Sequence, residues 1–521
     1  MLRKLLLVFA LLLPGAAQAE WREASSERFL VYSEGSEANL RDFTEKLEKF
    51  DYLLRVVSNT KAPPSPIKLK IYLMDNFAGV QKTLPYEAGG IAGYYSASSR
   101  GPIAVGVSGS TRAKGKLNPQ SVLLHEYAHH FMFQYFPASY PSWYSEGFAE
   151  YYGQTEILKK DVMEVGHIAE HRYGSFYGNR WLPLRKMLAA RSYSDVPEID
   201  LLYAQGWLLV HYLAQKKERA GQLEKYLNLI NAGQSYEQAM NAAFGEDAAK
   251  LDDELRTYSG KVKHDVTVLP FKTIQLRPIT IRALSPAEKA LIWQEIALGR
   301  GILKSEASGF AADVRRIAAR YPDDPYALSL LIEAERAAGN NAAAMSAVDQ
   351  LLAIRPDDTR ALTHKGQLQM AALMEAKSAD KAAWEAARAY IIKANRTNPN
   401  DAFVLEAYYD SFAAQGVPAP PAAQNALFRA HELVPQDADL RYKVALDFER
   451  RNMIEDALAV IKPSAFQLHN DEQDPKKKKK QEEQAEKYRE VGKEKRESAR
   501  EMFDRLEKKL AAAKAASPAG G

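Results

Sequence analysis

The sequence predicts an α+β domain with a small mixed sheet, followed by an all-α solenoid of helical repeats. Two observations support this division. Short apolar runs before residue 108 have the spacing of strands, whereas residues 121–152 have the composition of buried helices. After residue 285 helical segments recur, separated by loops that contain Pro322, Pro356, Pro399 and Pro435. A chain of 521 residues is long enough for two or three domains.

Charge, hydrophobic content and cysteine count limit the kinds of partner and of stabilisation that the chain can have. Lys and Arg number 70 and Asp and Glu 66, so the formal net charge is +4. Such a balance gives no strong basic field, and we expect no nucleic-acid partner. Hydrophobic residues make up 46% of the chain, enough for a sizeable core. The chain has no cysteine, so its stability does not come from disulfides.

The first nineteen residues have the anatomy of a cleavable secretory signal. Arg3 and Lys4 precede an apolar run, residues 5–13, and Ala17-Gln-Ala19 supplies small residues before the cleavage point. The run is shorter than the roughly 20 residues that a membrane span needs. We therefore expect cleavage after Ala19 and a periplasmic protein, with full secretion as the alternative.

Strands and one long helix are expected before residue 108. Residues 29–32 indicate a short strand, and residues 67–73 alternate as a half-buried strand does. Residues 89–107 indicate a hairpin, whose second strand, residues 103–107, is either an edge strand or an inner strand. Between the first two strands, apolar side chains recur on one helical face: Leu40, Phe43, Leu47, Phe50, Leu54 and Val57.

His125, Glu126 and His129 form the pattern H-E-x-x-H in a segment apolar enough to be a buried helix, with Asn118 and Pro119 as its start. Two histidines four residues apart leave the same helix face one turn apart. Both can therefore reach one zinc ion at about 2.0–2.1 Å. Glu126 is about 100° further round the helix, so its carboxylate can face a zinc-bound water without being a ligand.

A second helix, expected from Pro141-Ser142, carries two glutamates. The interval between His129 and Glu146 lets the chain finish the first helix, turn, and bring a second helix back beside the histidines. Glu146 can then complete a His₂Glu zinc site whose fourth coordination position is open. Glu150, one turn further on the same face, suits a carboxylate that holds the distal N–H of a histidine ligand. Burying His125, His129 and Glu146 without a metal would be costly, so we expect bound Zn²⁺.

The segments HEYAH and WYSEGFAEY resemble those of the gluzincin metallopeptidases, which include thermolysin and the aminopeptidase N family. The resemblance implies that Glu146 is the third zinc ligand and Glu150 a supporting carboxylate. Residues 202–213 resemble the Y-E-K-G segment of the aminopeptidases, which implies that Tyr203 hydrogen-bonds the tetrahedral intermediate. The implied activity is hydrolysis of peptide bonds by a zinc-activated water, with Glu126 as the general base.

Two further features bear on the substrate that this family would take. The aminopeptidase segment G-x-M-E-N does not occur in the sequence, which favours an endopeptidase or a peptidase with unusual specificity. If residues 103–107 form an edge strand, they would pair with an extended peptide. His130, next to the motif, is interpreted as a core histidine or a support for a ligand.

The pattern changes again after the second zinc segment. Residues 154–260 have a mostly helical pattern, and we expect them to form the lower half of the active-site cleft. Residues 261–284 indicate a connecting segment. Ser285-Pro-Ala-Glu288 then gives an N-cap, a first-turn proline and a capping-box glutamate, so a new helix begins there. The expected divisions are a signal peptide (1–19), a gluzincin-like metallopeptidase domain (20–260), a connecting segment (261–284), helical repeats (285–463) and a charged tail (464–521).

Residues 285–463 resemble tetratricopeptide repeats. Pro322 and Pro356 are 356 − 322 = 34 residues apart, which is the tetratricopeptide period. The later, longer intervals imply an insertion near residues 374–380. The resemblance implies a stacked array whose concave surface recruits or positions a protein partner.

The sequence allows more than one hypothesis for the C-terminal tail and for the overall function. Residues 476–480 are five lysines before Glu- and Lys-rich sequence, which indicates a charged helix or a disordered arm. Contact of this arm with a membrane or a cell-wall polymer is the weaker alternative. The main hypothesis is an exported zinc peptidase whose repeats position a peptide or protein substrate. Its rival is a catalytically weak or inactive metal-binding scaffold that acts in envelope protein assembly.

Overall fold

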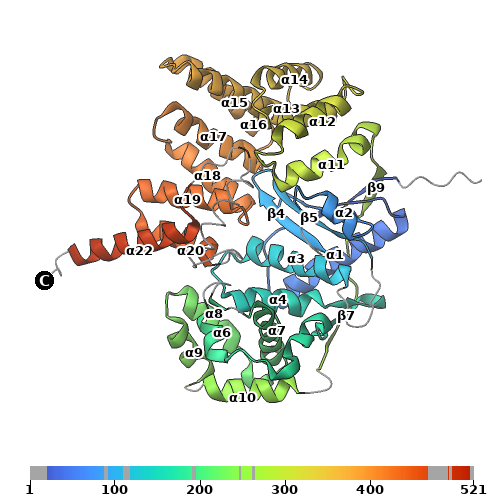
Figure 1. Cartoon of the computed structure of the whole chain (residues 1–521), viewed down its shortest axis with the longest axis vertical. Helices are drawn as coiled ribbons and strands as arrows, with labels where there is room; N and C mark the ends of the chain where they lie inside the picture. Colours follow the sequence, from blue (N-terminus) through green and yellow to red (C-terminus); the bar gives the residue numbers. More distant parts are fainter. Residues whose placement is uncertain are drawn as a thin grey trace, which may run out of the picture.

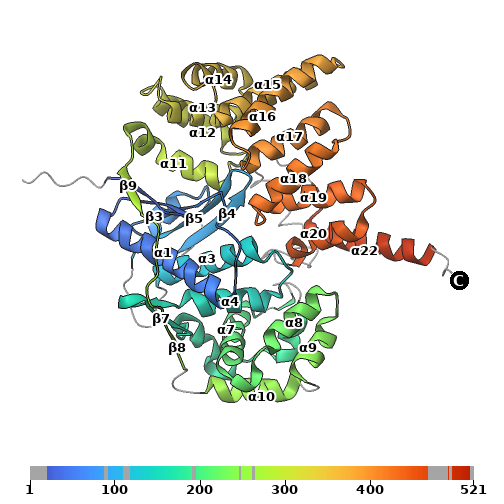
Figure 2. The same ribbon diagram turned by 180° about the vertical axis from the view of Figure 1, so that it is seen from behind.

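A six-stranded mixed sheet lies at the centre of the molecule, between two helical regions (Figures 1 and 2). The structure is a computed structural model, and it describes residues 20–86, 92–109, 118–190, 195–196, 198–245, 248–260, 265–466, 491 and 496–516. The expected signal peptide and the five-lysine run lie outside the described residues. Within the described part, no helix is long and apolar enough to cross a membrane.

The sheet has the strand order β4-β5-β3-β2-β1-β9. Strands β2, β3 and β5 are parallel, whereas β1, β4 and β9 run antiparallel to their neighbours. Because β5 lies between β4 and β3, residues 103–107 belong to an inner strand. The strands are β1 (Arg22–Ser25), β2 (Phe29–Ser33), β3 (Leu69–Met74), β4 (Gly93–Ser98), β5 (Gly101–Val107) and β9 (Thr280–Ala283).

Helix α1 (Glu37–Val57) connects β2 to β3 and packs on the sheet. Ser36 caps its start by accepting a hydrogen bond from the amide of Asn39. The expected apolar face is buried at Leu40, Leu47, Phe50 and Leu54, whereas Val57 at the end of the helix is exposed. The periodicity therefore predicted both the helix and its buried face.

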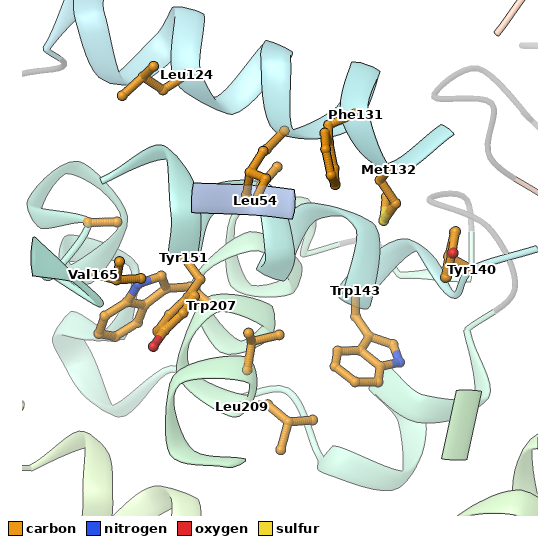
Figure 3. Close-up of a cluster of buried hydrophobic side chains, with 14 of the residues drawn as sticks. Leu54, Leu124, Phe131, Met132, Tyr140, Trp143, Tyr151, Val165, Trp207 and Leu209 are labelled. Carbon is orange, nitrogen blue, oxygen red and sulfur yellow. The ribbon is translucent and has the colours of Figure 1, made fainter. Parts of the chain in front are cut away.

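Helices α3 (Pro119–Tyr135) and α4 (Ser142–Gly153) form the layer below the sheet. Asn118 caps α3 as expected, by accepting a hydrogen bond from the amide of Gln120. Helix α7 (Ile199–Gln215) packs beneath α4, and Figure 3 shows apolar side chains from α3, α4 and α7 filling the space between them. This core fixes the relative positions of the three helices.

Two glycines bring the backbones of α4 and α7 into contact. A Cβ atom at Gly147 would lie 2.4 Å from the carbonyl oxygen of Gly206, and one at Gly206 would lie 2.4 Å from that of Trp143. Real Cβ atoms do not approach so closely, so the contact requires glycine on both helices. The close approach sets how far Tyr203, on α7, lies from the residues of α4.

Residues 154–260 complete the region at the far end from the repeats (Figures 1 and 2). This region is mostly helical, as expected, with a three-stranded sheet in the order β6-β7-β8. The remaining elements here are β6 (Glu156–Ile157), β7 (Val162–Val165), α5 (Glu170–Tyr173), α6 (Leu184–Ala189), α8 (Gln222–Asn231), α9 (Tyr236–Phe244) and α10 (Ala248–Ser259).

The segment expected to be a connection contributes a strand to each sheet. Strand β8 (Thr267–Pro270) pairs with β7, and β9 pairs with β1 at the edge of the central sheet. Residues 265–284 therefore pass from the lower region to the edge of the central sheet and add apolar side chains to the cores beside both sheets. The next helix, α11 (Pro286–Arg300), begins at the predicted capping box of Ser285 and Glu288.

Antiparallel helix pairs continue from α11 to α20 and arch round the β4 side of the sheet (Figures 1 and 2). This confirms the predicted helical solenoid. The helices are α12 (Ala307–Ala318), α13 (Pro325–Ala337), α14 (Asn341–Ile354), α15 (Thr359–Glu375), α16 (Lys381–Thr397), α17 (Ala402–Gln415), α18 (Pro421–Leu433), α19 (Ala438–Arg450) and α20 (Ile454–Phe466).

The recurring proline loops have a common structural role. In each loop the aspartate two residues after the proline caps the first helix of the next pair through hydrogen bonds from backbone amides. These caps are Asp324, Asp358, Asp401 and Asp437. The predicted insertion near residues 374–380 lengthens α15 and leads to Asp380, which caps α16.

The array and the sheet share a core. Ile292 and Ile296 of α11 pack against Tyr72 and Val105 of the sheet. At the other end of the array, helix α22 (Ala499–Ala516) packs on α20 through Met502, Phe503 and Leu506. The described part of the tail is thus a charged helix with one apolar face.

Candidate metal centre

The three predicted zinc ligands meet in one place, between α3 and α4. Nε2 of His125 and Nε2 of His129 are 3.1 Å apart. Oε2 of Glu146 lies 3.4 Å from each of these nitrogens. The glutamate is buried, and the two histidines are partly exposed.

These distances fit a tetrahedral metal ion. Bonds of about 2.0–2.1 Å to a tetrahedral zinc ion require ligand atoms about 3.3–3.4 Å apart. The three atoms form a triangle close to that size, and two imidazoles with one carboxylate are a donor set that zinc accepts. The residues present therefore suit a zinc ion, with three ligands from the chain.

Further side chains support the ligands from behind. Oε1 of Glu150 lies 3.8 Å from Nδ1 of His125, and it accepts a hydrogen bond of 2.7 Å from Nε of Arg172. Oε2 of Glu150 lies 3.6 Å from Nε2 of His171. On the other histidine, Nδ1 of His129 lies 3.3 Å from the hydroxyl of Ser145. Both ligand rings thus have a polar partner on the side away from Glu146, as metal-binding histidines usually do.

The charges of this cluster are strongly coupled. Burial acts to raise the pKa of Glu146, but the charge of His129 and the hydrogen bonds of both histidines outweigh it, so this pKa lies well below its usual range. Burial likewise opposes ionisation of Glu150, yet His171, His125 and Arg172 lower its pKa to about 2. Burial would lower the pKa of His125, but its hydrogen bond to Glu146 and the nearby carboxylates raise it to about 9. Both glutamates are therefore anionic at neutral pH.

Glu126 and Tyr203 lie near the ligands without joining them. The negative charge of Glu126 acts on His125 and on Tyr203. The ring of Tyr203 lies under the guanidinium of Arg172, with 4.3 Å between the guanidinium carbon and the ring centroid. Burial raises the pKa of Tyr203, and the charge of Glu146 adds to that effect. The structure brings both residues to the cluster, and the catalytic roles expected for them stay predictions.

Three supporting residues were missed by the reasoning from sequence. Ser145, His171 and Arg172 contact the ligands or Glu150. His171 and Arg172 belong to the short helix α5, more than forty residues after H-E-x-x-H, and no spacing rule connects them to it. Ser145 directly precedes Glu146, so its position on the same helix was the one available signal.

His130 faces away from the ligands and contacts the repeats. It is buried, and burial lowers its pKa to about 3, so the ring is neutral. The hydroxyl of Tyr95 lies 3.0 Å from its Nδ1. The side-chain amide of Gln436, in the loop before α19, donates to the backbone carbonyl of His130 over 3.2 Å. The expected core histidine is thus also a contact between α3 and the array.

A second group of metal-binding side-chain types occurs among the described residues. Glu156, Glu164 and His167 place their ligand atoms within 4.8 Å of one another. Nε2 of His167 lies 3.0 Å from Glu164 and 4.0 Å from Glu156. All three side chains are partly exposed, so we treat this group as a surface ion-pair cluster.

Comparisons with known proteins found similarity among solved structures. No family model and no curated protein matches the sequence. Among solved structures, TTC0263, a thermophilic TPR protein of Thermus thermophilus, is 21% identical with a TM-score of 0.30, covering 36% of this chain and 93% of that chain. Pseudomonas aeruginosa PilF is 14% identical with a TM-score of 0.28, covering 44% and 93%. MamA from Desulfovibrio magneticus RS-1 is 17% identical with a TM-score of 0.25, covering 33% and 90%.

These comparisons correct part of the sequence interpretation. None of the structures named above is described as a peptidase, and no family model or curated protein matches, so the identification as a gluzincin and the assignment as a zinc endopeptidase or other hydrolase are not upheld. The expected peptide substrate is withdrawn with them. The physical reason lies in what the motif specifies. H-E-x-x-H with a later glutamate fixes a ligand geometry, and such a geometry suits a metal whether or not the site turns over a substrate.

Proposed function

We propose that this chain is an exported, metal-binding scaffold whose helical repeats bind a protein partner. The triangle formed by His125, His129 and Glu146, with edges of 3.1–3.4 Å, is the observation that carries the metal part of the proposal. The stacked helix pairs support the scaffold part, because such arrays present extended surfaces for other proteins. The rival hypothesis from the sequence thus fits better than the peptidase.

Bound zinc would supply a Lewis acid held by three protein ligands with a fourth position for water. The chain's own contribution is to join two helices at one point, since two ligands belong to α3 and one to α4. Glu150 and Ser145 would orient the histidine rings through their second nitrogens. In this role Glu126 adds negative charge beside His125, and Tyr203 packs against Arg172, which holds Glu150.

The helical array contacts α3, the helix that carries His125 and His129. Gln436 contacts the backbone of His130 and the side chain of Gln134, both on α3. A partner that moves the loop before α19 would therefore act directly on the helix that carries two ligands. This contact is why we assign the metal centre and the repeats to one functional unit.

The location proposed for this unit is the periplasm, on the strength of residues 1–19 alone. A scaffold there would act in assembly of envelope proteins. The lysine run could add an electrostatic contact with an anionic surface, although we give this less weight.

Elemental analysis of the purified mature chain tests the metal centre. We expect about one zinc per chain, with loss of zinc in His125→Ala, His129→Ala and Glu146→Gln. Glu164→Gln is the matched control, because it removes the same charge from the neighbouring surface cluster. Full zinc content in Glu146→Gln would show that Glu146 is not a ligand.

The scaffold part needs a separate test. Site-specific crosslinking from exposed positions of the array in living cells should capture a defined protein. Incubation of the zinc-loaded chain with unfolded casein should leave the casein intact. Cleavage that a chelator stops and that Glu126→Gln abolishes would overturn the scaffold proposal in favour of a hydrolase.

A further inference from the structure

A cavity of about 280 Å³ lies between the central sheet and the first repeats. Its walls come from β3 and β5 on one side and from α11, α13 and α15 on the other. It shares no lining residue with the metal centre. Ile103, Leu298 and Leu330 form an apolar part of the wall, and the remainder includes charged side chains, two tyrosines and a serine.

The turn between β4 and β5 holds the two halves of this cavity together. Arg100, in that turn, makes a two-pronged ion pair with Glu333 of α13, with N–O distances of 2.7 and 3.3 Å. The guanidinium of Arg100 also lies on the ring of Phe403, 4.9 Å from its centroid. On the opposite wall, Lys70 of β3 pairs with Glu295 of α11 at 2.6 Å. Each of these two carboxylates is therefore matched by one cation.

Two more guanidinium groups, one in the cavity wall and one on α13 outside the lining, are less well compensated. Arg360 lines the cavity, and its guanidinium carbon lies 4.5 Å from the centroid of the Phe403 ring. The carboxylate paired with Arg360, Asp401, is 3.8 Å away. Nη1 of Arg360 is buried and donates to no hydrogen-bond acceptor among the described residues. A buried donor of a charged group without a partner is unfavourable, so an acceptor bound beside Arg360 would stabilise it.

Arg336 adds to this excess of positive charge. It follows Glu333 by one turn of α13 and donates to two neutral acceptors, Nδ1 of His364 and Oε1 of Gln367. Burial, together with the charge of Arg100 and against the attraction of Glu333, lowers the pKa of Arg336 to about 10. The described residues here thus present four cations, Lys70, Arg100, Arg336 and Arg360, to three carboxylates, Glu295, Glu333 and Asp401.

We propose that this cavity binds a small organic anion, whose carboxylate or phosphate group pairs with Arg360 while its carbon chain lies against Ile103 and Leu330. An oxyanion accepts the planar N–H donors of a guanidinium well, and the local charge excess favours one negative group. The volume is at the lower end for ligand pockets, which suits a metabolite-sized molecule rather than a folded partner.

The site differs in kind from the partner surface of the repeats. Strands of the sheet close one side of the cavity, so a ligand there would contact both the sheet and the array. Binding of the anion would strengthen the attachment of the first repeats to the sheet. The metal centre takes no part in anion binding. The test of the anion site and the tests of the proposed function can therefore fail independently of one another.

Isothermal titration of the mature chain with succinate, glycerol 3-phosphate and inorganic phosphate, at constant chloride, tests the proposal. We expect saturable binding of at least one of the two organic probes, and no binding of the neutral diamide of succinate. The preferred probe distinguishes a carboxylate ligand from a phosphate ligand. Inorganic phosphate lacks the carbon chain and should bind more weakly than a phosphate ester.

Arg360→Gln should weaken binding of the preferred probe by about tenfold or more, because it removes a charge-assisted hydrogen bond. Arg316→Gln is the matched control, since Arg316 is an exposed arginine on the neighbouring helix α12. His125→Ala should bind the probe as the wild type does. Absence of binding to every probe, or equal binding by the Arg360 and Arg316 variants, would overturn the proposal. Should Arg360→Gln fold poorly, Ser329→Phe, which fills the cavity from α13, should abolish binding, and unchanged binding there would also reject the site.

Discussion

Gln436, in the loop before α19, reaches across to α3 and donates its side-chain amide to the backbone carbonyl of His130 over 3.2 Å. The same amide lies 3.0 Å from the side-chain oxygen of Gln134, one turn further along α3. Residues about three hundred positions apart in the chain thus meet on the helix that carries two of the predicted metal ligands. The repeats are part of the surroundings of the centre, and the two regions are expected to respond to one another.

A double-mutant cycle measures this connection. Gln134→Ala and Gln436→Ala should each lower stability, and together they should lose less than the sum of the two. The interaction energy should be about 0.5–1.5 kcal/mol, as for other intramolecular hydrogen bonds. Urea unfolding of the four proteins gives the value. In the control cycle, Gln424→Ala replaces Gln436→Ala. The amide of Gln424 bonds inside the array to Ala419, so additive effects are expected there.

Replacing Gly147 or Gly309 by alanine should change the stability of the chain in opposite directions. At Gly147 a Cβ atom would collide with the backbone of Gly206, so Gly147→Ala should push α4 from α7 and cost about 1–3 kcal/mol. At Gly309, inside α12, no atom lies within 4 Å of the added Cβ. Gly309→Ala should therefore stabilise the chain by about 0.5–1 kcal/mol. Thermal unfolding followed by circular dichroism compares them, and a stable Gly147→Ala protein would refute the tight α4–α7 contact.

Two adjacent aspartates in one repeat loop allow the stabilising effect of a helix cap to be compared with that of a surface ion pair. Asp358 caps α15 by accepting from the amide of Ala361, whereas Asp357 beside it is exposed and pairs with Lys393. Asp358→Ala should cost about 1 kcal/mol. Asp357→Ala should stay within about 0.5 kcal/mol of the wild type. Equal losses in urea unfolding would mean that the loop aspartates do not act as caps.

Local signals in the sequence predicted much of this fold because each depends on neighbours along the chain. The capping residues Asn118 and Ser285 and the apolar face of α1 follow from helix periodicity and hydrogen bonding within one turn. The pairing of His125 with His129 follows from the same periodicity. Glu146 required one further assumption, a return of the chain after a short turn, and the structure satisfies it.

Contacts between distant segments could not be predicted in this way. Arg172 near Glu150, Gln436 near His130 and β9 beside β1 depend on how whole elements pack, and no residue spacing encodes them. The family interpretation failed for a different reason. A ligand pattern was extended to an activity, although fixing a metal and turning over a substrate impose different requirements on the remaining residues.

His431 makes the array sensitive to acid. Burial, with the charge of Arg441 nearby, lowers the pKa of His431 to about 3, below the value of about 6.5 in an unfolded chain. The unfolded state therefore binds the proton first, and the contribution of His431 to stability is complete above pH 6.5. Between pH 6.5 and 3 it should fall by about 1.4 kcal/mol per pH unit.

His431→Asn removes that dependence. The difference in unfolding free energy between wild type and variant should shrink from pH 7 to pH 5, as measured by urea unfolding at each pH. Asp437, whose pKa burial raises to about 7, acts in the opposite direction but is present in both proteins, so the difference isolates His431. A difference that is constant with pH would show that His431 titrates normally in the folded chain.

Glu150→Gln should distinguish a supporting carboxylate from a ligand. Glu150 contacts Nδ1 of His125 at 3.8 Å and is held by Arg172, so its amide variant should still place the ring but orient it less firmly. We expect the chain to bind one zinc with affinity about 10–100-fold weaker, as other losses of this kind produce. Competition with a chromophoric chelator gives the affinity, and elemental analysis at saturating zinc gives the count. Zinc absent from the Glu150 variant but retained by Glu146→Gln would reverse the two assignments, because the carboxylate nearest the metal would then be Glu150.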